Sequence, residues 1–375
     1  MKILVLFTYK NSLDTWKNSG IINRELSYYK NLSEKYNVKY IFLTFGDYHE
    51  HKYLNKYPNL TVIPIYEYIK KSNKNYILFL RTLKIPFLIK EQLKGVSLIK
   101  TNQLNGSWIA ILIKLIIKKP LLIRTGYDAF IFSIRDKKSI FKKVLYYLLT
   151  QIALVFSNLY TVTSKDDYEF IKKKYLFKKS KIKIRPNWVV AYPNMNFENR
   201  ENLRIVSVGR LVAQKNYGFL IKEFSNTNYT IDIIGEGPDR DKLERMAKTF
   251  NSNIIFHGNL PNHKLMDILG SSKYFISTSI YEGNSKVLLE ALASGCLVFA
   301  ADIKNNSEII THEQTGILFK LKEAELINSF NKYSNDEICR KISENAVMHV
   351  SKNYSLSKIS DNEYSDYIGI LGQRD

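Results

Sequence analysis

Cysteine is almost missing from this sequence of 375 residues, which contains only Cys296 and Cys339. Two cysteines cannot build a disulfide scaffold, and no Cys and His spacing in the chain suits a zinc site. The sequence therefore predicts a protein of a reducing compartment that holds no structural metal.

Hydrophobic runs long enough to span a bilayer are also lacking. The longest apolar stretches, residues 108–119 and 144–156, are interrupted by Lys114 or Gln151 and fall short of the ~20 residues that a spanning helix needs. The opening run MKILVLF is shorter still, and no small-residue cleavage site follows it. We therefore predict a soluble or peripheral protein whose first residues form a strand.

Acidic residues are scarce in the first half of the chain. Residues 1–190 contain 35 Lys and Arg against 12 Asp and Glu, a net charge of +23, whereas residues 191–375 contain 21 against 23. Two segments, 134–147 and 172–185, interleave the bases with Tyr, Phe and Leu. This pattern suits an anionic membrane surface or another polyanion, and equally a Lys-rich surface that meets only water. No helix-turn-helix, zinc-finger or RNA-recognition signature accompanies the charge, so nucleic acid is not predicted as a partner.

Short apolar runs alternate with helical patterns, which predicts an α/β protein with parallel sheets covered on both faces. The expected strands are residues 3–7, 40–43, 60–64, 97–101, 121–124, 159–162 and 182–184, followed by 203–209, 230–237, 253–258, 274–278 and 297–301. Between the two sets, RPNWVVAYPN (185–194) has two prolines and no helical period, and we interpret it as a linker. We expect two Rossmann-like domains, residues 1–190 and 191–354, whose sheets face each other across a cleft.

Two glycine-containing turns follow strands of the second domain. In VGRLVAQKN, Gly209 ends a strand, Arg210 stands at the tip, and Lys215 is expected to begin the next helix, so the loop predicts an anion pocket suited to a diphosphate. Two solvent-exposed bases are the alternative. In GEGPDRDKLE, Gly235 and Gly237 could let backbone approach a nucleotide, or the segment is a capped surface helix. The glycines do not complete a dinucleotide-binding fingerprint.

The stretch YEGNSKVLLEALASG places Glu282 after a strand and Glu290 within a predicted helix. Gly283, Asn284 and Ser285 form the helix entry, where N–H groups lack partners within the helix. Eight residues is slightly more than two helical turns, so we expect both carboxylates near one face, reaching the same ligand. A general acid and base pair, or two unrelated surface acids, are the alternatives.

Residues 205–319 resemble the C-terminal half of retaining glycosyltransferases with the GT-B fold, of glycosyltransferase family 4. The resemblance is carried, in order, by VSVGRLVAQKN, IDIIGEGPDRDKLE, IIFHGNLPNHKLMDIL, EGNSKVLLEALASGCLVFAADIKNNSEII and TGILF. It implies a nucleoside-diphosphate sugar, UDP- or GDP-linked, as donor and no metal or other cofactor. It also implies that a final helix, about residues 355–375, packs back on the first domain and buries Ile359, Tyr367 and Ile370.

The resemblance assigns roles to residues of the second domain. Arg210 and Lys215 would bind the diphosphate and stabilise the leaving group, Glu282 would hold sugar hydroxyls, and Glu290 the ribose. The N–H groups of Asn284, Ser285 and Lys286 would also face the donor.

The first domain departs from the family pattern after the strand in LLIRTGYD, where Tyr127 stands in the position of a common histidine. An acceptor site rebuilt around Tyr127 and Asp128 is one interpretation, altered donor turnover a second, and an ordinary turn a third. In WKNSGIINREL, Ser19 and Gly20 take the place of a double glycine in a loop that, in the family, approaches the donor phosphates and the acceptor.

We therefore predict transfer of a sugar to a hydroxyl of a glycan, lipid-linked or of a cell-surface polysaccharide such as capsule or lipopolysaccharide. We expect a cytoplasmic enzyme, peripheral to the inner face of the membrane, whose basic first domain meets an acceptor anchored there. A nucleotide-sugar 2-epimerase of the same fold and a catalytically degenerate polyanion-binding protein are the alternatives.

Overall fold

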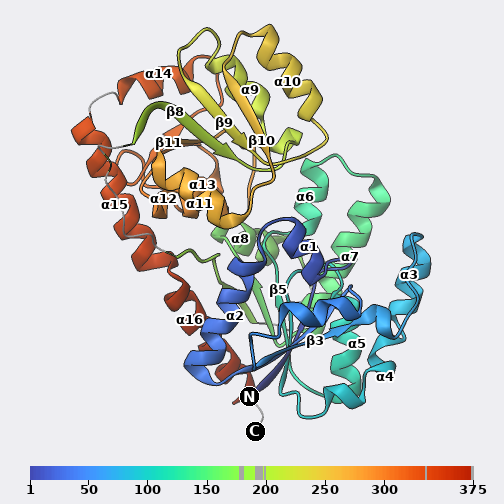
Figure 1. Cartoon of the computed structure of the whole chain (residues 1–375). Helices are drawn as coiled ribbons and strands as arrows, with labels where there is room; N and C mark the ends of the chain where they lie inside the picture. The colour runs from blue at the N-terminus through green and yellow to red at the C-terminus, as the bar shows by residue number, and fades with distance from the viewer. Residues whose placement is uncertain (177–180, 191–196, 198–199, 334–335, 373–375) are drawn as a thin grey trace. The chain divides into compact units, whose positions relative to one another are not determined.

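The chain forms two compact units in the computed structural model, which describes residues 1–176, 181–190, 197, 200–333 and 336–372 (Figure 1). One unit comprises Met1–Arg185 together with Ser360–Asp375, and the other comprises Pro186–Ile359. The chain thus passes from one unit to the other within the stretch interpreted as a linker, of which residues 191–194 lie outside the described residues.

A seven-stranded parallel sheet is the centre of the first unit. Its strands are β1 (Lys2–Leu6), β2 (Lys39–Thr44), β3 (Leu60–Pro64), β4 (Leu98–Thr101), β5 (Leu121–Arg124), β6 (Leu159–Val162) and β7 (Lys181–Ile184), in the order β3-β2-β1-β4-β5-β6-β7. Its helices are α1 (Leu13–Asn18), α2 (Ile22–Tyr36), α3 (Asn75–Thr82), α4 (Ile85–Leu88), α5 (Ser107–Ile117), α6 (Ala129–Arg135), α7 (Ile140–Phe156) and α8 (Lys165–Lys174).

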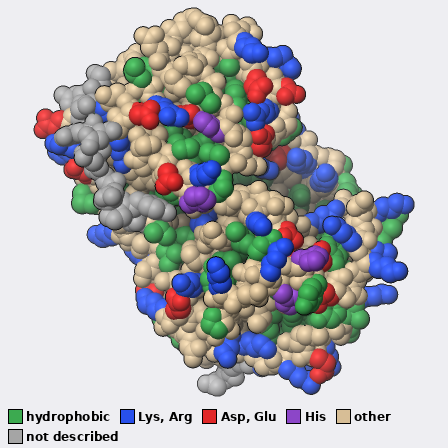
Figure 2. Space-filling view, in the orientation of Figure 1, with side chains coloured by type: hydrophobic (Ala, Val, Ile, Leu, Met, Phe, Trp, Pro, Cys, Tyr) green, Lys and Arg blue, Asp and Glu red, His purple; other side chains and the backbone are tan. Residues whose placement is uncertain are grey.

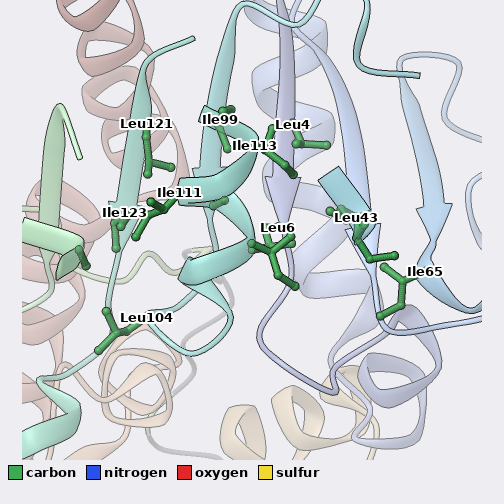
Figure 3. Packing of buried hydrophobic residues seen from close by; sticks show 14 of the residues in the cluster. Leu4, Leu6, Leu43, Ile65, Ile99, Leu104, Ile111, Ile113, Leu121 and Ile123 are labelled. Carbon is green, nitrogen blue, oxygen red and sulfur yellow. The ribbon is translucent and has the colours of Figure 1, made fainter. Parts of the chain in front are cut away.

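Alternate side chains of these strands enter two different cores, which explains why the strands are apolar throughout. Leu4, Leu6 and Ile99 pack on one face with Ile113 of α5 (Figure 3). The opposite face is rich in aromatic rings, such as that of Phe42, whose centroid lies 4.9 Å from that of Tyr29 in α2. Both faces of the central strands are therefore covered.

Helix α16 (Leu356–Leu371) completes the aromatic face of the first unit. The expected apolar residues Tyr367 and Ile370 are buried in this unit, and Ile359, which belongs to the second unit, is buried as well. Its carboxylates are bonded to the unit as well: Asp361 accepts from Lys35 at 2.7 Å, and Asp366 accepts from Lys183 at 2.6 Å.

The second unit contains a six-stranded parallel sheet. Its strands are β8 (Glu201–Val208), β9 (Thr230–Ile234), β10 (Ile254–Gly258), β11 (Ser272–Ser277), β12 (Leu297–Ala301) and β13 (Ile317–Phe319), in the order β10-β9-β8-β11-β12-β13. Its helices are α9 (Tyr217–Glu223), α10 (Arg240–Thr249), α11 (Asn262–Ser271), α12 (Lys286–Ala293), α13 (Lys304–Ser307), α14 (Glu325–Lys332) and α15 (Asp336–Tyr354).

Alternation along the strands again divides the core. On β12, Phe299 packs into one cluster with Ile276, whereas Val298 and Ala300 pack into the other with Leu289 of α12. All twelve expected strands are present, and β13 is an addition.

In both sheets, the order in which successive strands are added reverses at a corresponding place. The strand order runs outward in one direction from β1 to β3 and in the other from β4, and likewise from β8 to β10 and from β11. In open parallel sheets, ligands bind outside the carboxyl ends of the strands at such a switch point. In the second unit, this is the edge at which β8 and β11 end.

No helix within the described residues is both long enough and apolar enough to cross a membrane. Both cysteines are buried.

Candidate active site

The loop after β8 begins at Gly209, which has a φ of 157°. A Cβ at this position would lie 2.9 Å from Cε of Lys215, so glycine leaves room for the lysine side chain to fold over the strand end. Tyr217 donates its hydroxyl to the Gly209 carbonyl at 3.2 Å. Arg210 is exposed at the tip. The prediction that Lys215 begins the next helix is wrong, because Ala213–Lys215 is a 3₁₀ turn and α9 begins at Tyr217.

Lys215 and Glu282 are brought together from the loops after β8 and β11. The lysine Nζ lies 2.5 Å from Oε1 of the glutamate, and only 18% and 9% of the two side chains are exposed. Because β8 and β11 flank the switch point, this ion pair occupies the place where the fold binds ligands.

Three further hydrogen bonds hold the two loops in register. The Ile280 N–H donates to the Gln214 carbonyl at 2.9 Å, and the Gln214 side chain donates to the Tyr281 carbonyl at 2.7 Å. The Thr278 hydroxyl donates to the Lys215 carbonyl at 2.8 Å. The sequence analysis did not identify Gln214 and Thr278. Thr278 is the last residue of the predicted strand 274–278, and its place at the strand end was the available signal.

Helix α12 begins beside the ion pair. Ser285 is its N-cap residue and accepts from the Leu288 N–H at 3.4 Å, while Gly283 precedes it in the loop. Asn284 accepts from the Asn187 N–H at 2.8 Å, so its side chain is used within the unit. The Lys286 ammonium group lies 4.9 Å from the ring centroid of Trp188. The amino end of α12, with its partial positive charge, thus stands next to Glu282.

Glu290 lies in the second turn of α12 and is 4% exposed. Its Oε1 accepts from the amide of Asn262, the first residue of α11, at 3.2 Å. The expectation that Glu282 and Glu290 share a helix face is wrong, because the helix begins only at Lys286. The two acids approach from different elements, a loop and a helix.

Gly235 and Gly237 lie in close contact with backbone atoms of the loop after β8. A Cβ at Gly235 would stand 2.1 Å from the Gly209 carbonyl oxygen, and one at Gly237 would stand 2.3 Å from that of Leu211. The Leu211 N–H donates to the Glu236 carbonyl at 3.0 Å. These glycines therefore allow the loops after β8 and β9 to pack against each other, which fixes the turn that carries Arg210.

In the first unit, Ser19 and Gly20 connect α1 to α2. The Ser19 hydroxyl donates to the Thr15 carbonyl at 2.7 Å, and Gly20 has a φ of 73°. The chain then enters α2 at Ile22, so Ser19 and Gly20 lie in a loop, as the sequence predicts.

Tyr127 and Asp128 follow β5 but differ in accessibility. Tyr127 is 43% exposed, and its ring stacks on that of Phe132 at 4.1 Å. Asp128 is fully buried, caps α6 by accepting from the Ile131 N–H at 2.9 Å, and accepts the Tyr175 hydroxyl at 3.0 Å. Burial raises the pKa of Asp128. The structure therefore gives Asp128 a structural role, and its expected place on the acceptor side is corrected.

Among the described residues, no group of three or more His, Cys, Asp and Glu side chains is arranged to hold a metal ion. A pocket of about 510 Å³ lies beside the site, between α9 and α10. Its lining includes Val212 and Ile280 but neither Lys215 nor Glu282.

Comparisons with known proteins relate the chain to enzymes that transfer sugars. Residues 192–348 match the family model "Glycosyl transferases group 1". The N-acetylgalactosamine-N,N'-diacetylbacillosaminyl-diphospho-undecaprenol 4-alpha-N-acetylgalactosaminyltransferase of Campylobacter jejuni is 25% identical over 308 residues, 77% of this chain and 82% of the relative. The capsular polysaccharide biosynthesis glycosyltransferase CapH of Staphylococcus aureus is 34% identical over 145 residues, 36% of this chain and 40% of the relative.

Solved structures resemble the chain over nearly its whole length. Sucrose-phosphate synthase from Thermosynechococcus elongatus has a TM-score of 0.80 at 15% identity and covers 99% of both chains. Anabaena HepE, in complex with UDP and glucose, has a TM-score of 0.72 at 16% identity and covers 98% of this chain and 100% of its own. At these identities, the likeness establishes the fold.

Proposed function

The chain belongs to the glycosyl transferases group 1 family and has the GT-B fold, and from this premise we propose which reaction it performs. We propose that it moves a sugar from a nucleoside diphosphate to a hydroxyl of a glycan, with retention of the anomeric configuration and without a metal ion. The observation that carries the proposal is the Lys215–Glu282 pair at the switch point of the second sheet.

The diphosphate of the donor would be held by Lys215 and Arg210. Lys215 has three N–H donors and uses one toward Glu282, so it can bridge the carboxylate and a phosphate oxygen. Arg210 is exposed at the tip of the same loop and can present a planar pair of donors to phosphate. The sequence Gly283, Asn284, Ser285 and Lys286 would add backbone N–H groups at the amino end of α12.

The sugar and the ribose would be held by the two carboxylates. Glu282 accepts hydrogen bonds only, which suits sugar hydroxyls, and the ion pair with Lys215 fixes its position before the donor binds. Glu290 is held in position by a hydrogen bond from Asn262 and would accept hydrogen bonds from the ribose hydroxyls. Gly209, Gly235 and Gly237 would contribute through the shape of the loops rather than through contacts of their own.

Breaking the bond to the sugar places negative charge on the departing diphosphate. Preorganised cations and a helix terminus stabilise such charge as it develops, because they need no reorganisation during the reaction. Lys215 and Arg210 together with the start of α12 would perform the task that a metal ion performs elsewhere.

The acceptor would bind at the carboxyl ends of the first sheet. Tyr127 is exposed there and can hydrogen-bond a sugar hydroxyl in the position of the family's histidine. Gly20, at the turn before α2, gives the chain a left-handed conformation that brings the amino end of α2 toward this edge. Ser19 precedes it and is exposed.

A lipid-linked acceptor is favoured by two observations. The relative from Campylobacter jejuni acts, by its name, on a diphospho-undecaprenol. The first 190 residues have a net charge of +23, which suits the surface of an anionic membrane to which the enzyme would be peripheral. Capsule or lipopolysaccharide assembly would use such an acceptor.

A donor screen tests the proposal. Thermal unfolding is measured with UDP-sugars, GDP-sugars and the free nucleotides, since a ligand at 100 times its Kd stabilises a protein by about 2.7 kcal/mol. The nucleotide sugar that binds is then incubated with the enzyme and a lipid-linked glycan, in the presence of EDTA. The anomeric configuration of the product is determined by NMR. An inverted product, or loss of turnover in EDTA, contradicts the proposal. Conversion of the nucleotide sugar in the absence of an acceptor would indicate the 2-epimerase instead.

A further inference from the structure

Helix α7 exposes an apolar stripe along its outer side. Its members are Ile140, Phe141, Val144, Leu145, Leu148 and Ile152, which are between 46% and 77% exposed. The other side of the helix contributes Ala153 and Leu154 to the core of the first unit. The stripe is therefore not a core surface, and the described part of the unit does not cover it.

The six residues lie on one side of the helix. At about 100° per residue, they fall within an arc of about 140°. Single exposed apolar residues are ordinary on protein surfaces, but a stripe that runs along most of a 17-residue helix indicates an interaction site. The helix is too short to span a bilayer, which leaves a contact along its length.

Lysine residues border the stripe. The same geometry places Lys142 and Lys143 on its two sides, and Lys137 and Lys138 lie in the turn before the helix. Residues 137–165 contain no Asp or Glu. Figure 2 shows further Lys and Arg side chains along the edge of the first unit where α3 lies in Figure 1.

The combination of an apolar face with a cationic border selects the partner. In a symmetric dimer through this face, the lysines of the two copies would be brought close together, and their repulsion would oppose association. An anionic bilayer satisfies both features, because its acyl chains accept the stripe and its headgroups attract the lysines.

We propose that α7 lies in the interface of an anionic membrane, with the stripe turned to the acyl chains and Lys142 and Lys143 at the headgroups. This rests on the proposed function, since a lipid-linked acceptor requires the enzyme at that surface. The proposal selects one helix, α7, from the two basic segments that the sequence indicates, residues 134–147 and 172–185. Aromatic and aliphatic side chains at its first turn, Ile140 and Phe141, would enter first.

Flotation with liposomes tests the proposal on the full chain. Vesicles of phosphatidylcholine with 30% phosphatidylglycerol, a composition chosen for the assay at roughly physiological anionic content, are compared with pure phosphatidylcholine. The double variant Ile140→Gln, Phe141→Gln is expected to bind the anionic vesicles at least about tenfold more weakly than the wild type. The double variant Lys142→Gln, Lys143→Gln is expected to weaken binding at low salt and to reduce its dependence on salt concentration.

The matched control is Phe87→Gln, Leu88→Gln in α4, where the two side chains are 68% and 47% exposed in the same unit. It should bind vesicles as the wild type does. Unchanged binding by the α7 variant, or an equal loss in the control, overturns the proposal. So does a dimer in the absence of lipid that the α7 variant abolishes.

The test separates this inference from the proposed function by a second measurement on the same proteins. Titration with the donor identified in the screen should give the same Kd for wild type and α7 variant. Donor binding without vesicle binding rejects the role of α7 alone. Vesicle binding without binding of any nucleotide sugar rejects the proposed function and leaves the membrane contact supported.

Discussion

Lys100 of β4 and Glu363 of α16 form an ion pair buried inside the first unit. Their side chains are 2% and 6% exposed, and Glu363 also accepts the Tyr28 hydroxyl at 2.8 Å. Burial disfavours charge on Glu363, but the cations Lys100 and Arg124 nevertheless hold its pKa below the usual value. The pair joins residues 263 positions apart in the chain.

Replacing Glu363 with Ala is expected to destabilise the first unit by about 3–5 kcal/mol, because the Lys100 charge would stay buried without its partner. The measurement is denaturant unfolding. The double variant Lys100→Met, Glu363→Leu removes both charges at similar volume and should recover most of the loss. If the double variant is no more stable than the single one, the ion pair is not the source of the effect.

The Lys215–Glu282 pair is expected to control turnover. Lys215→Ala should lower kcat/KM by about 10²–10³-fold, the usual effect of removing one group that stabilises developing charge. Glu282→Gln keeps the shape of the side chain and should lower it by a similar order. Lys222→Ala, which removes an exposed lysine from α9, is the control and should leave turnover unchanged. Full activity in both site variants would reject the site.

The first unit should lose stability as the pH rises from about 4 to about 6. Burial raises the pKa of Asp167 to about 6, so the folded state favours the protonated carboxyl. Its unfolded pKa is about 3.9, and the contribution is therefore fully present below pH 4 and lost as pH rises through 6, at most about 3 kcal/mol. Unfolding at about pH 4 and about pH 7, on either side of the two pKa values, measures the difference.

Asp167→Asn should be less dependent on pH over this range than the wild type. Asp166→Asn controls for the loss of one acidic residue at the same helix end. An equal dependence in wild type and Asp167→Asn would show that the carboxyl is not responsible.

Gly237→Ala should weaken donor binding by displacing the loops that form the donor site. The new Cβ would meet the Leu211 carbonyl oxygen at 2.3 Å and force apart the loops after β8 and β9. We expect a loss of about 1–3 kcal/mol in stability and weaker donor binding. Gly270→Ala in α11 has no atom within 4 Å of its Cβ and should be neutral or stabilising by up to about 1 kcal/mol. Calorimetry measures the stability of the two variants and their affinity for the donor.

The strands were predictable because their signal is local. Runs such as 121–124 and 159–162 are apolar at three of their four positions, because side chains on both faces of these strands are buried. The loops after β8 and β11 could also be identified as a candidate site, since parallel strands place their carboxyl ends at one edge.

What the sequence could not reveal depends on contacts between distant segments. Asp128 resembles an acceptor residue in its motif, but it is buried and accepts a hydrogen bond from Tyr175, which lies 47 residues away. The glycines after β9 resemble a nucleotide-binding turn until the backbone of residues 209–211 is seen to occupy their space. The helix that begins at Lys286 could not be delimited from spacing alone, and the inferred common face of Glu282 and Glu290 failed for that reason.

The division of the first unit between Met1–Arg185 and Ser360–Asp375 has a consequence for biosynthesis. While the ribosome is still translating the second unit, Lys100 has no carboxylate to neutralise it, and the aromatic face of the first sheet is incomplete. The second unit, which is continuous in the chain, can acquire its structure before the first has finished. We therefore expect nascent chains that stop short of α16 to be substrates for chaperones and proteases, even though most of their sheet has already been made.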